Sequence, residues 1–193
     1  MNAKKILALA LAALMLLSLA ACGQSAEPIA TEAPAEPTEA PVEATEAPAE
    51  DTSVTVTDMT GREITLEEPA TRIVALTASD CEIICALGGM DLLVGRGTYC
   101  DYPAEVQEIP SVQSGYETNI EQIIALEPQV LLMSTMAQTE EQIKALEDAG
   151  VHVVVSDAQD IEGTYAAIRM IGALMAKDDA AEALIGDMQA TFD

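Results

Sequence analysis

Residues 72–94 read RIVALTASDCEIICALGGMDLLV. The run 72–76 is short, apolar and rich in β-branched side chains, which is typical of a buried strand. Ser79, with a glutamate three residues later, matches a capping box, so we expect a helix to begin there. The glycines at 88–89 should end that helix, and residues 91–94 should form the next strand. This strand–helix–strand unit predicts an α/β fold with a mostly parallel sheet.

The same alternation continues toward the C-terminus. Asn119 and Thr139 are placed to cap two further helices. Residues 130–133 (VLLM) and 151–155 (VHVVV) read as buried strands, and the second of these contains the single histidine, His152. Ligands of parallel sheets bind at the carboxyl ends of the strands. In this chain those ends lead to residues 77–79, 95–102, 134–138 and 156–159.

Two flanking segments complete the folded part. Residues 53–66 alternate in polarity around a turn and predict an opening β-hairpin. Together with the alternating units they make an α/β lobe over residues 53–158. Asp160 should begin a helical segment over residues 159–193, with a break near 177–179. An apolar stripe on a helix needs a surface to cover it, and nothing after the last helix supplies one, so we expect the chain to be a fragment.

The N-terminal part predicts export and tethering. Two lysines, an apolar run and small residues before Cys22 indicate a secretory signal over residues 1–21, and the run is short for a membrane span, which needs about 20 residues. Leu-Ala-Ala-Cys22 resembles a bacterial lipobox, whose cysteine is lipid-modified. Within residues 22–52, the stretch 31–51 repeats Thr-Glu-Ala-Pro with a period of seven residues. Proline in every repeat forbids a continuous helix, so this segment is predicted to be an extended, disordered tether.

The composition excludes several functions. The chain has 33 acidic and 8 basic residues, a formal net charge of -25, and nucleic-acid binding depends on neutralising phosphates with Lys and Arg. We therefore expect no nucleic-acid partner. One histidine excludes multi-histidine metal sites. The sequence holds no glycine-rich phosphate loop, nucleophile elbow or HExxH motif, so we predict no enzyme, no catalytic residues and no cofactor.

Three cysteines remain after Cys22. Cys81 and Cys85 lie four residues apart on one predicted helix, and Cys100 lies in a loop. With His152 they could bind a metal, but cysteine is also a common small core residue, and we favour the core interpretation and no metal site. A bridge between the two helical cysteines would have poor geometry. The pairing of the three cysteines is left open.

Several further segments occur in a characteristic order. Residues 99–103 (YCDYP), 119–121 (NIE) and 124–128 (IALEP) are the most telling. They resemble the substrate-binding proteins of bacterial ABC importers for ferric siderophores, haem and cobalamin, and the resemblance extends over about residues 54–193. It implies a periplasmic-binding-protein fold of two α/β lobes joined by one long helix. On that template the chain comprises the tether, the first lobe and the start of the interlobe helix, and the second lobe is missing.

The resemblance also implies roles for individual residues. Tyr99 matches a ligand-contacting tyrosine of the cobalamin binders, or else packs against its own lobe. Tyr116 lies where those proteins place a tryptophan. Arg96 lies in the same segment after a strand as Tyr99, and it could contact an anionic chelate or pair with Asp101. Glu121 matches the acid that meets an arginine of the permease, or is an ordinary acid favoured by the helix dipole.

Taken together, these features imply a solute-binding lipoprotein outside the cytoplasmic membrane, anchored through Cys22. It would capture a small-molecule metal chelate and deliver it to an ABC permease with its ATPase. The loop Tyr99–Pro103 favours a corrinoid over a ferric siderophore or haem. The alternative is an adhesive or structural surface lipoprotein with no transport role.

The lipobox can be tested directly. Replacing Cys22 with alanine removes the sulfur that would carry the lipid, so Cys22→Ala is expected to move the protein from the membrane fraction to the soluble fraction. Immunoblots of the two fractions measure this. Retention of the variant in the membrane fraction would show that Cys22 is not the anchor.

Overall fold

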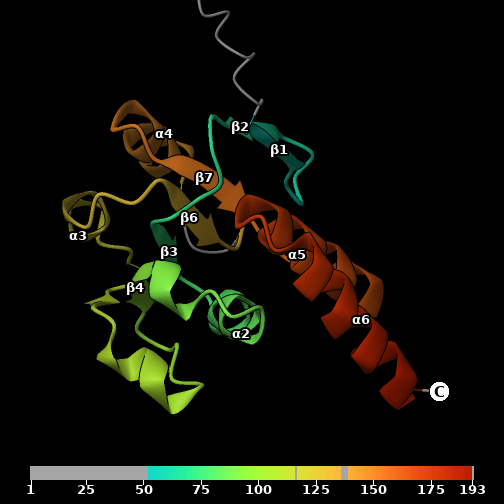
Figure 1. The fold of residues 1–193 in the computed structure, drawn as a ribbon. Coiled ribbons are helices and arrows are strands. Elements are labelled where there is room, and N and C mark those ends of the chain that lie inside the picture. The colour runs from blue at the N-terminus through green and yellow to red at the C-terminus, as the bar shows by residue number, and fades with distance from the viewer. Residues whose placement is uncertain (1–51, 116, 136–138, 193) are drawn as a thin grey trace, which may run out of the picture. The chain divides into compact units, whose positions relative to one another are not determined.

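The computed structural model describes residues 52–115, 117–135 and 139–192. Its main sheet has the strand order β5-β4-β3-β6-β7, and every neighbouring pair in it is parallel. This arrangement confirms the predicted α/β class with a parallel sheet (Figure 1). The strands are β3 (Ile73–Ala75), β4 (Leu93–Gly97), β5 (Ser111–Val112), β6 (Val130–Met133) and β7 (His152–Val155).

Helices cover both faces of the sheet. One buried cluster joins Ile73 and Ala75 of β3 to residues of three helices on one face, and a second joins Val74 and Leu76 to two helices on the other. All four residues of β6 are buried, as expected for a central parallel strand covered on both sides. The first face carries α2 (Ala78–Ala86), α5 (Ile161–Leu174) and α6 (Asp178–Phe192), and the second α3 (Ile120–Ala125) and α4 (Glu140–Asp148).

The opening hairpin is present, formed by β1 (Val54–Thr57) and β2 (Glu63–Leu66) in antiparallel pairing. Its turn is organised by the buried carboxylate of Asp58, which accepts bonds from the backbone N–H groups of Thr60 and Arg62. Burial alone would raise the pKa of Asp58, but hydrogen bonds from Thr60, Arg62 and Val155 hold it below its ordinary value of 3.8.

The same turn covers the outer edge of β7. Val155 donates its N–H to Asp58 Oδ2 at 3.3 Å, and its carbonyl accepts from Met59 N at 3.0 Å. Arg62 Nη2 donates to the Val153 carbonyl at 2.7 Å. An uncovered edge strand exposes unpaired backbone groups to other chains. Here the hairpin turn satisfies those groups.

Most predicted helix starts are confirmed. Asn119 caps α3, and Thr139 caps α4 in a complete capping box with Gln142. Asp160 caps α5 by accepting from the N–H of Gly163 at 2.7 Å. In these cases the capping side chain bonds a backbone group within three residues, so a local pattern is enough to predict it.

The start of α2 was predicted wrongly. Its cap is Thr77, which accepts from the N–H of Asp80, and Ser79 lies inside the helix. The end of α2 is as expected: Gly88 has φ +69, a conformation that favours glycine, and its N–H bonds the carbonyl of Cys85. The helix therefore begins two residues earlier than the capping-box pattern indicates.

The next strand also differs from the prediction. Residues Met90–Leu92 form a 3-10 turn, η1, and β4 begins only at Leu93 and runs to Gly97. The strand extends because Arg96 and Gly97 pair with the short strand β5, a partner that no local pattern reveals. The predicted loop 95–114 thus contains the end of β4, a second 3-10 turn η2 (Ala104–Glu108) and β5.

His152 is exposed, whereas the sequence predicted it to be buried. It is the first residue of β7, the edge strand of the sheet. At the end of an edge strand one side chain of the apolar run can face outward, while the following three valines are buried.

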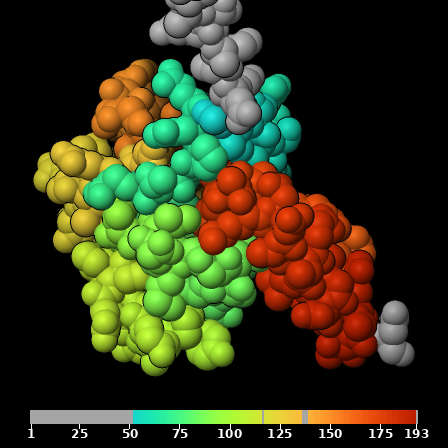
Figure 2. Space-filling model, viewed as in Figure 1, coloured from blue at the N-terminus to red at the C-terminus, as the bar shows by residue number. Residues whose placement is uncertain are grey.

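The C-terminal helical segment breaks where predicted, between α5 and α6. The apolar stripe of α6 is covered, contrary to the expectation: Ala181 and Ile185 are buried in the cluster that contains α5. A Cβ added at Gly172 would lie 2.8 Å from Cβ of Ala181, so the glycine permits the close approach of the two helices. They lie side by side along one flank of the molecule, coloured red in Figure 2.

The predicted signal, Cys22 and all but the last residue of the predicted tether lie outside the described residues, as does Tyr116. Among the residues that are described, no helix combines the length and the apolar character that a membrane crossing requires. The boundaries of the signal, tether and lobe stay predictions.

Candidate functional site

The carboxyl ends of the parallel strands meet at one edge of the sheet, as the sequence predicted. Backbone hydrogen bonds continue past the strands there: Leu76 N donates to the Leu132 carbonyl at 3.0 Å, and Ser156 N to the Met133 carbonyl at 2.8 Å. These bonds hold the segments that follow β3, β6 and β7 beside one another. We call this the strand-end edge, made of residues 77–80, 97–102, 134–135 and 156–157.

Gly97 brings the end of β4 against the end of β3. A Cβ at this position would lie 2.1 Å from the carbonyl oxygen of Leu76 and 2.8 Å from Ser114 Oγ, far inside van der Waals contact. Any larger residue would therefore push the following loop away from the strand-end edge. Thr98 then fixes that loop by donating from Oγ1 to the Val112 carbonyl at 3.1 Å.

A buried carboxyl group lies at the centre of the edge. Asp80, in the first turn of α2, is 0% exposed. Thr77 Oγ1 donates to Asp80 Oδ2 at 2.6 Å, and the Ser156 hydroxyl also bonds this carboxyl group. Asp80 Oδ1 has no hydrogen-bond partner within the part of the chain that the structure describes.

This environment disfavours the charged form of Asp80. Burial raises its pKa to about 6, although the hydrogen bonds from Thr77 and Ser156 oppose the rise. The negative charge of Asp157 raises it further. Asp157 in turn accepts a hydrogen bond from Thr135 Oγ1. With Asp101 of the loop after β4, the strand-end edge therefore contains three carboxyl groups beside these hydroxyl groups.

Two tyrosines extend from the loop after β4. The side chain of Tyr99 is 76% exposed and that of Tyr102 is 66% exposed. Tyr99 Cε2 lies 3.9 Å from the position of a Cβ on Gly115, but most of its surface stays accessible instead of packing into the lobe. Tyr102 was not among the predicted ligand residues. Its place as the second tyrosine of the YCDYP motif was the sequence signal that could have identified it.

Arg96 does not pair with Asp101, which corrects that expectation. Its Nη1 donates to the Gly97 carbonyl and its Nη2 to the Gln107 carbonyl, each at 3.3 Å. The guanidinium thus holds η2 against β4. Its Nε is buried and has no hydrogen-bond partner among the described residues, so a ligand role for Arg96 stays a prediction.

Glu121 lies at the start of α3, the helix that follows β5. It is exposed in the first turn of α3, where the helix dipole favours an acid. Gln122 Oε1 accepts from the N–H of Gln113 at 3.1 Å, and this bond places the start of α3 next to the end of β5. Glu121 is therefore available to a partner that approaches from the strand-end side.

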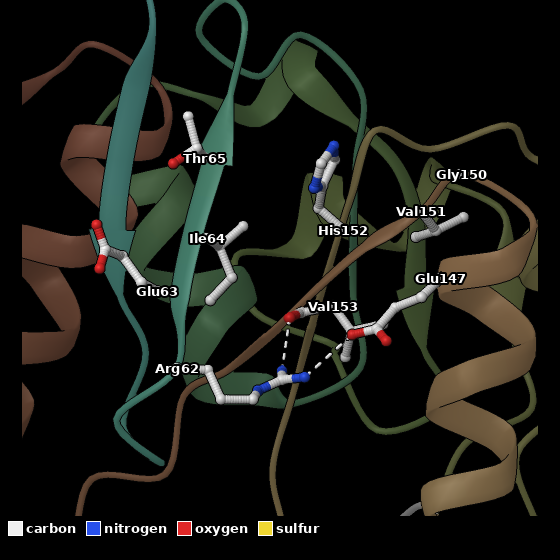
Figure 3. A pocket seen from close by; sticks show the side chains of 9 residues that line it. All are labelled: Arg62, Glu63, Ile64, Thr65, Glu147, Gly150, Val151, His152 and Val153. Carbon is white, nitrogen blue, oxygen red and sulfur yellow. Dashed lines mark hydrogen bonds and ion pairs between the residues drawn. The ribbon is translucent and has the colours of Figure 1, made fainter.

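A hollow of about 560 Å³ lies elsewhere, between β2 and the first half of β7 (Figure 3). Arg62 crosses it, donating to Glu147 Oε1 at 3.0 Å and to the Val153 carbonyl at 2.7 Å. Its Nε donates to Asp58. Through these bonds Arg62 links the hairpin to the sheet. Because its guanidinium is already engaged within the protein, this hollow is not the proposed ligand site.

The cysteines and the histidine do not form one cluster. Cys81 and Cys100 are buried in the core, while His152 lines the hollow at β7. Among the described residues, no three His, Cys, Asp or Glu side chains are grouped so that they could hold a metal ion. What the strand-end edge offers is hydrogen bonding and aromatic surface.

Comparison with known proteins gives the family. The sequence pattern of the family described as Periplasmic binding protein matches residues 73–193. The chain belongs to this family. It is 35% identical over 139 residues to YvrC of Bacillus subtilis (strain 168), an uncharacterized ABC transporter substrate-binding lipoprotein, a match that covers 70% of this chain and 44% of YvrC.

Other members are similar over shorter stretches. A vitamin B12-binding protein of Salmonella choleraesuis (strain SC-B67) is 31% identical over 54% of this chain and 38% of its own length. A periplasmic heme binding protein from Pseudomonas aeruginosa superposes with a TM-score of 0.60 and 30% identity, over 63% of this chain and 44% of that one. The chain thus spans less than half the length of each of these three relatives.

The buried carboxyl group of Asp80 predicts that the stability of the fold falls as the pH rises. An acid whose pKa is higher in the folded than in the unfolded state lowers stability as pH rises through the interval between the two values, here about 4 to 6. Asp80→Asn removes this titration. At pH 8 the variant should therefore be more stable than the wild type, by up to about 3 kcal/mol, and this advantage should vanish near pH 4.

Urea unfolding of wild type and variant across this pH range measures the difference. Asp101→Asn is the matched control, because it removes the same charge from an exposed position and should leave the pH dependence unchanged. An Asp80→Asn variant with no advantage at pH 8 would contradict the assigned cost of burying this carboxylate.

Proposed function

We propose that the chain provides the first lobe of an ABC importer's substrate-binding lipoprotein, and that it binds a large metal chelate at the strand-end edge. The observation that carries the proposal is the pair of exposed tyrosines, Tyr99 and Tyr102, beside this edge. Exposed aromatic rings offer broad apolar faces with a polar tip, and such surfaces are typical of binding sites. The named relatives are binding proteins and not enzymes, which supports a binding role.

A corrinoid fits the edge better than haem does. Asp157 is half-buried and Asp101 is exposed, and these two acids make the edge acidic, while Thr77 and Thr135 contribute hydroxyl groups. A corrin ring carries peripheral amides, whose N–H groups donate to such acceptors. Haem carries two carboxylates, which two acids at close range would repel. The named relatives include both a vitamin B12-binding protein and a heme binding protein, so the choice of a corrinoid rests on the acidity of the edge.

The remaining parts of the proposal concern delivery. The protein would act outside the cytoplasmic membrane, held there by a lipid on Cys22, and would pass its ligand to a permease that works with an ATPase. Glu121 would contact an arginine of the permease. An exposed carboxylate suits this role because an arginine can bind it through two parallel hydrogen bonds.

Ligand titration tests the proposed ligand. The complete protein, with its second lobe, should bind cobalamin saturably and more tightly than haem or a ferric siderophore. Tyr99→Ala should weaken cobalamin binding at least about 5-fold, the effect of losing a central aromatic contact. Phe192→Ala is the matched control, since it removes another largely exposed ring, from the far end of α6. Tight binding of haem alone would overturn the corrinoid choice, and no saturable binding would favour the adhesive role.

Transport assays test the docking residue. Glu121→Arg reverses the charge that would meet the permease, so uptake should fall roughly tenfold or more while ligand affinity stays unchanged. Glu141→Arg is the control, because Glu141 is also an exposed acid in the first turn of a helix, α4. Unchanged uptake by Glu121→Arg would refute docking through this residue.

A further inference from the structure

Two thiols meet beneath the loop that carries the exposed tyrosines. Cys81 belongs to the first turns of α2, and Cys100 follows Tyr99 in the loop after β4. Both side chains are fully buried. The Sγ atom of Cys81 lies 3.7 Å from the carbonyl oxygen of Ala75, and that of Cys100 lies 3.8 Å from the same oxygen. The end of β3 therefore holds both sulfur atoms around one acceptor.

The two thiols also interact with each other. A hydrogen bond from Cys81 to the Cys100 sulfur raises the pKa of Cys81 and lowers that of Cys100. Burial adds to the rise at Cys81, and the nearby charge of Arg96 favours the thiolate of Cys100. Thiol–disulfide exchange begins with a thiolate.

Cys85 is a poorer partner for either cysteine. It lies one turn beyond Cys81 on α2, where a bridge between the two would distort the helix. Its side chain is only partly buried, and its interaction with Cys100 is electrostatic, without a hydrogen bond between the two thiols. The arrangement therefore selects one pair among the three thiols of the described residues.

We propose that Cys81 and Cys100 are a disulfide-forming pair that closes when the protein folds in an oxidising compartment. The oxidant is a small or protein disulfide. The thiolate of one cysteine attacks it, forming a mixed disulfide and releasing one thiol. The second cysteine then attacks the protein sulfur of that mixed disulfide, forms the Cys81–Cys100 bond and releases the second thiol. The two protons lost by the cysteines end on the two thiols released.

The burial of both sulfur atoms determines the stage of folding at which the disulfide can form. Because neither thiol is accessible in the folded lobe, an external disulfide reaches them only before the loop closes over α2. The bond should therefore form during folding, and the folded, reduced protein should resist the same reagent.

The bridge would fix the tyrosine loop to the start of α2. It joins residue 100, next to Tyr99, to residue 81, next to Asp80, so it would tie the aromatic and the acidic parts of the strand-end edge together. This consequence for ligand binding rests on the proposed function. The bond itself does not, and its detection is independent of any ligand.

The test is refolding of the full chain carrying Cys22→Ser, which leaves three cysteines. The protein is reduced in urea, diluted into a mixture of reduced and oxidised glutathione, and alkylated without reduction. Intact mass and a non-reducing peptide map then identify the bond. We expect one bridge, between Cys81 and Cys100, and one alkylated thiol on Cys85. Three alkylated thiols, or any bridge that involves Cys85, would overturn the proposal.

Two variants serve as matched controls. Cys85→Ser should keep the bridge, and Cys100→Ser should refold with both remaining thiols free. A bond across a loop of about 20 residues should raise Tm by roughly 10 °C, measured for the Cys85→Ser protein refolded with and without reductant. An equal Tm in both conditions would show that the bridge does not constrain the fold.

Ligand affinity separates the two proposals. If the bridge forms but protein refolded in the presence of reductant binds cobalamin with the same affinity, the link between loop and helix has no part in binding. If the bridge forms and no ligand binds under either condition, the proposed function fails while the disulfide stands.

Discussion

All five strands of the main sheet run parallel, and the rest of the structure depends on this constraint. Parallel neighbours need a crossover between them, so each strand is followed by a segment that returns over one face. The strand ends, and the loops after them, are therefore all on one edge. Short polar segments far apart in the sequence meet there, with Thr77 beside Ser156 at Asp80. The proposed binding site follows from strand direction before any particular residue is considered.

The start of α2 shows how the fold and the site share residues. Thr77 caps the helix and also bonds the carboxyl group of Asp80. The next residue, Cys81, faces the core and meets Cys100. A carboxyl group that burial shifts to a pKa of about 6 lowers stability at neutral pH, and such costs are common at functional sites. The proposed bridge one residue away would offset part of that cost during folding.

Local patterns predicted those features whose partners are local. The caps at Asn119, Thr139 and Asp160 bond backbone groups within three residues, and the sequence was enough to find them. The extension of β4 to Gly97 and the exposure of His152 depend on neighbours that are distant in the sequence, and both were predicted wrongly. Tyr99 was singled out by resemblance. Tyr102 was missed although it belongs to the YCDYP motif, and Asp80 was missed because only its burial in the folded chain distinguishes it from other acids.

By itself the sequence determined the α/β class, the alternation of strands and helices, and the acidity of the chain. These follow from periodicity, capping side chains and composition, which act over a few residues or over the whole chain. Only the tertiary structure decided the strand order β5-β4-β3-β6-β7, the contact between Cys81 and Cys100, and the burial of Asp80. Strand order arises from packing both sheet faces at once and from hydrogen bonds between distant segments, and no local pattern encodes either.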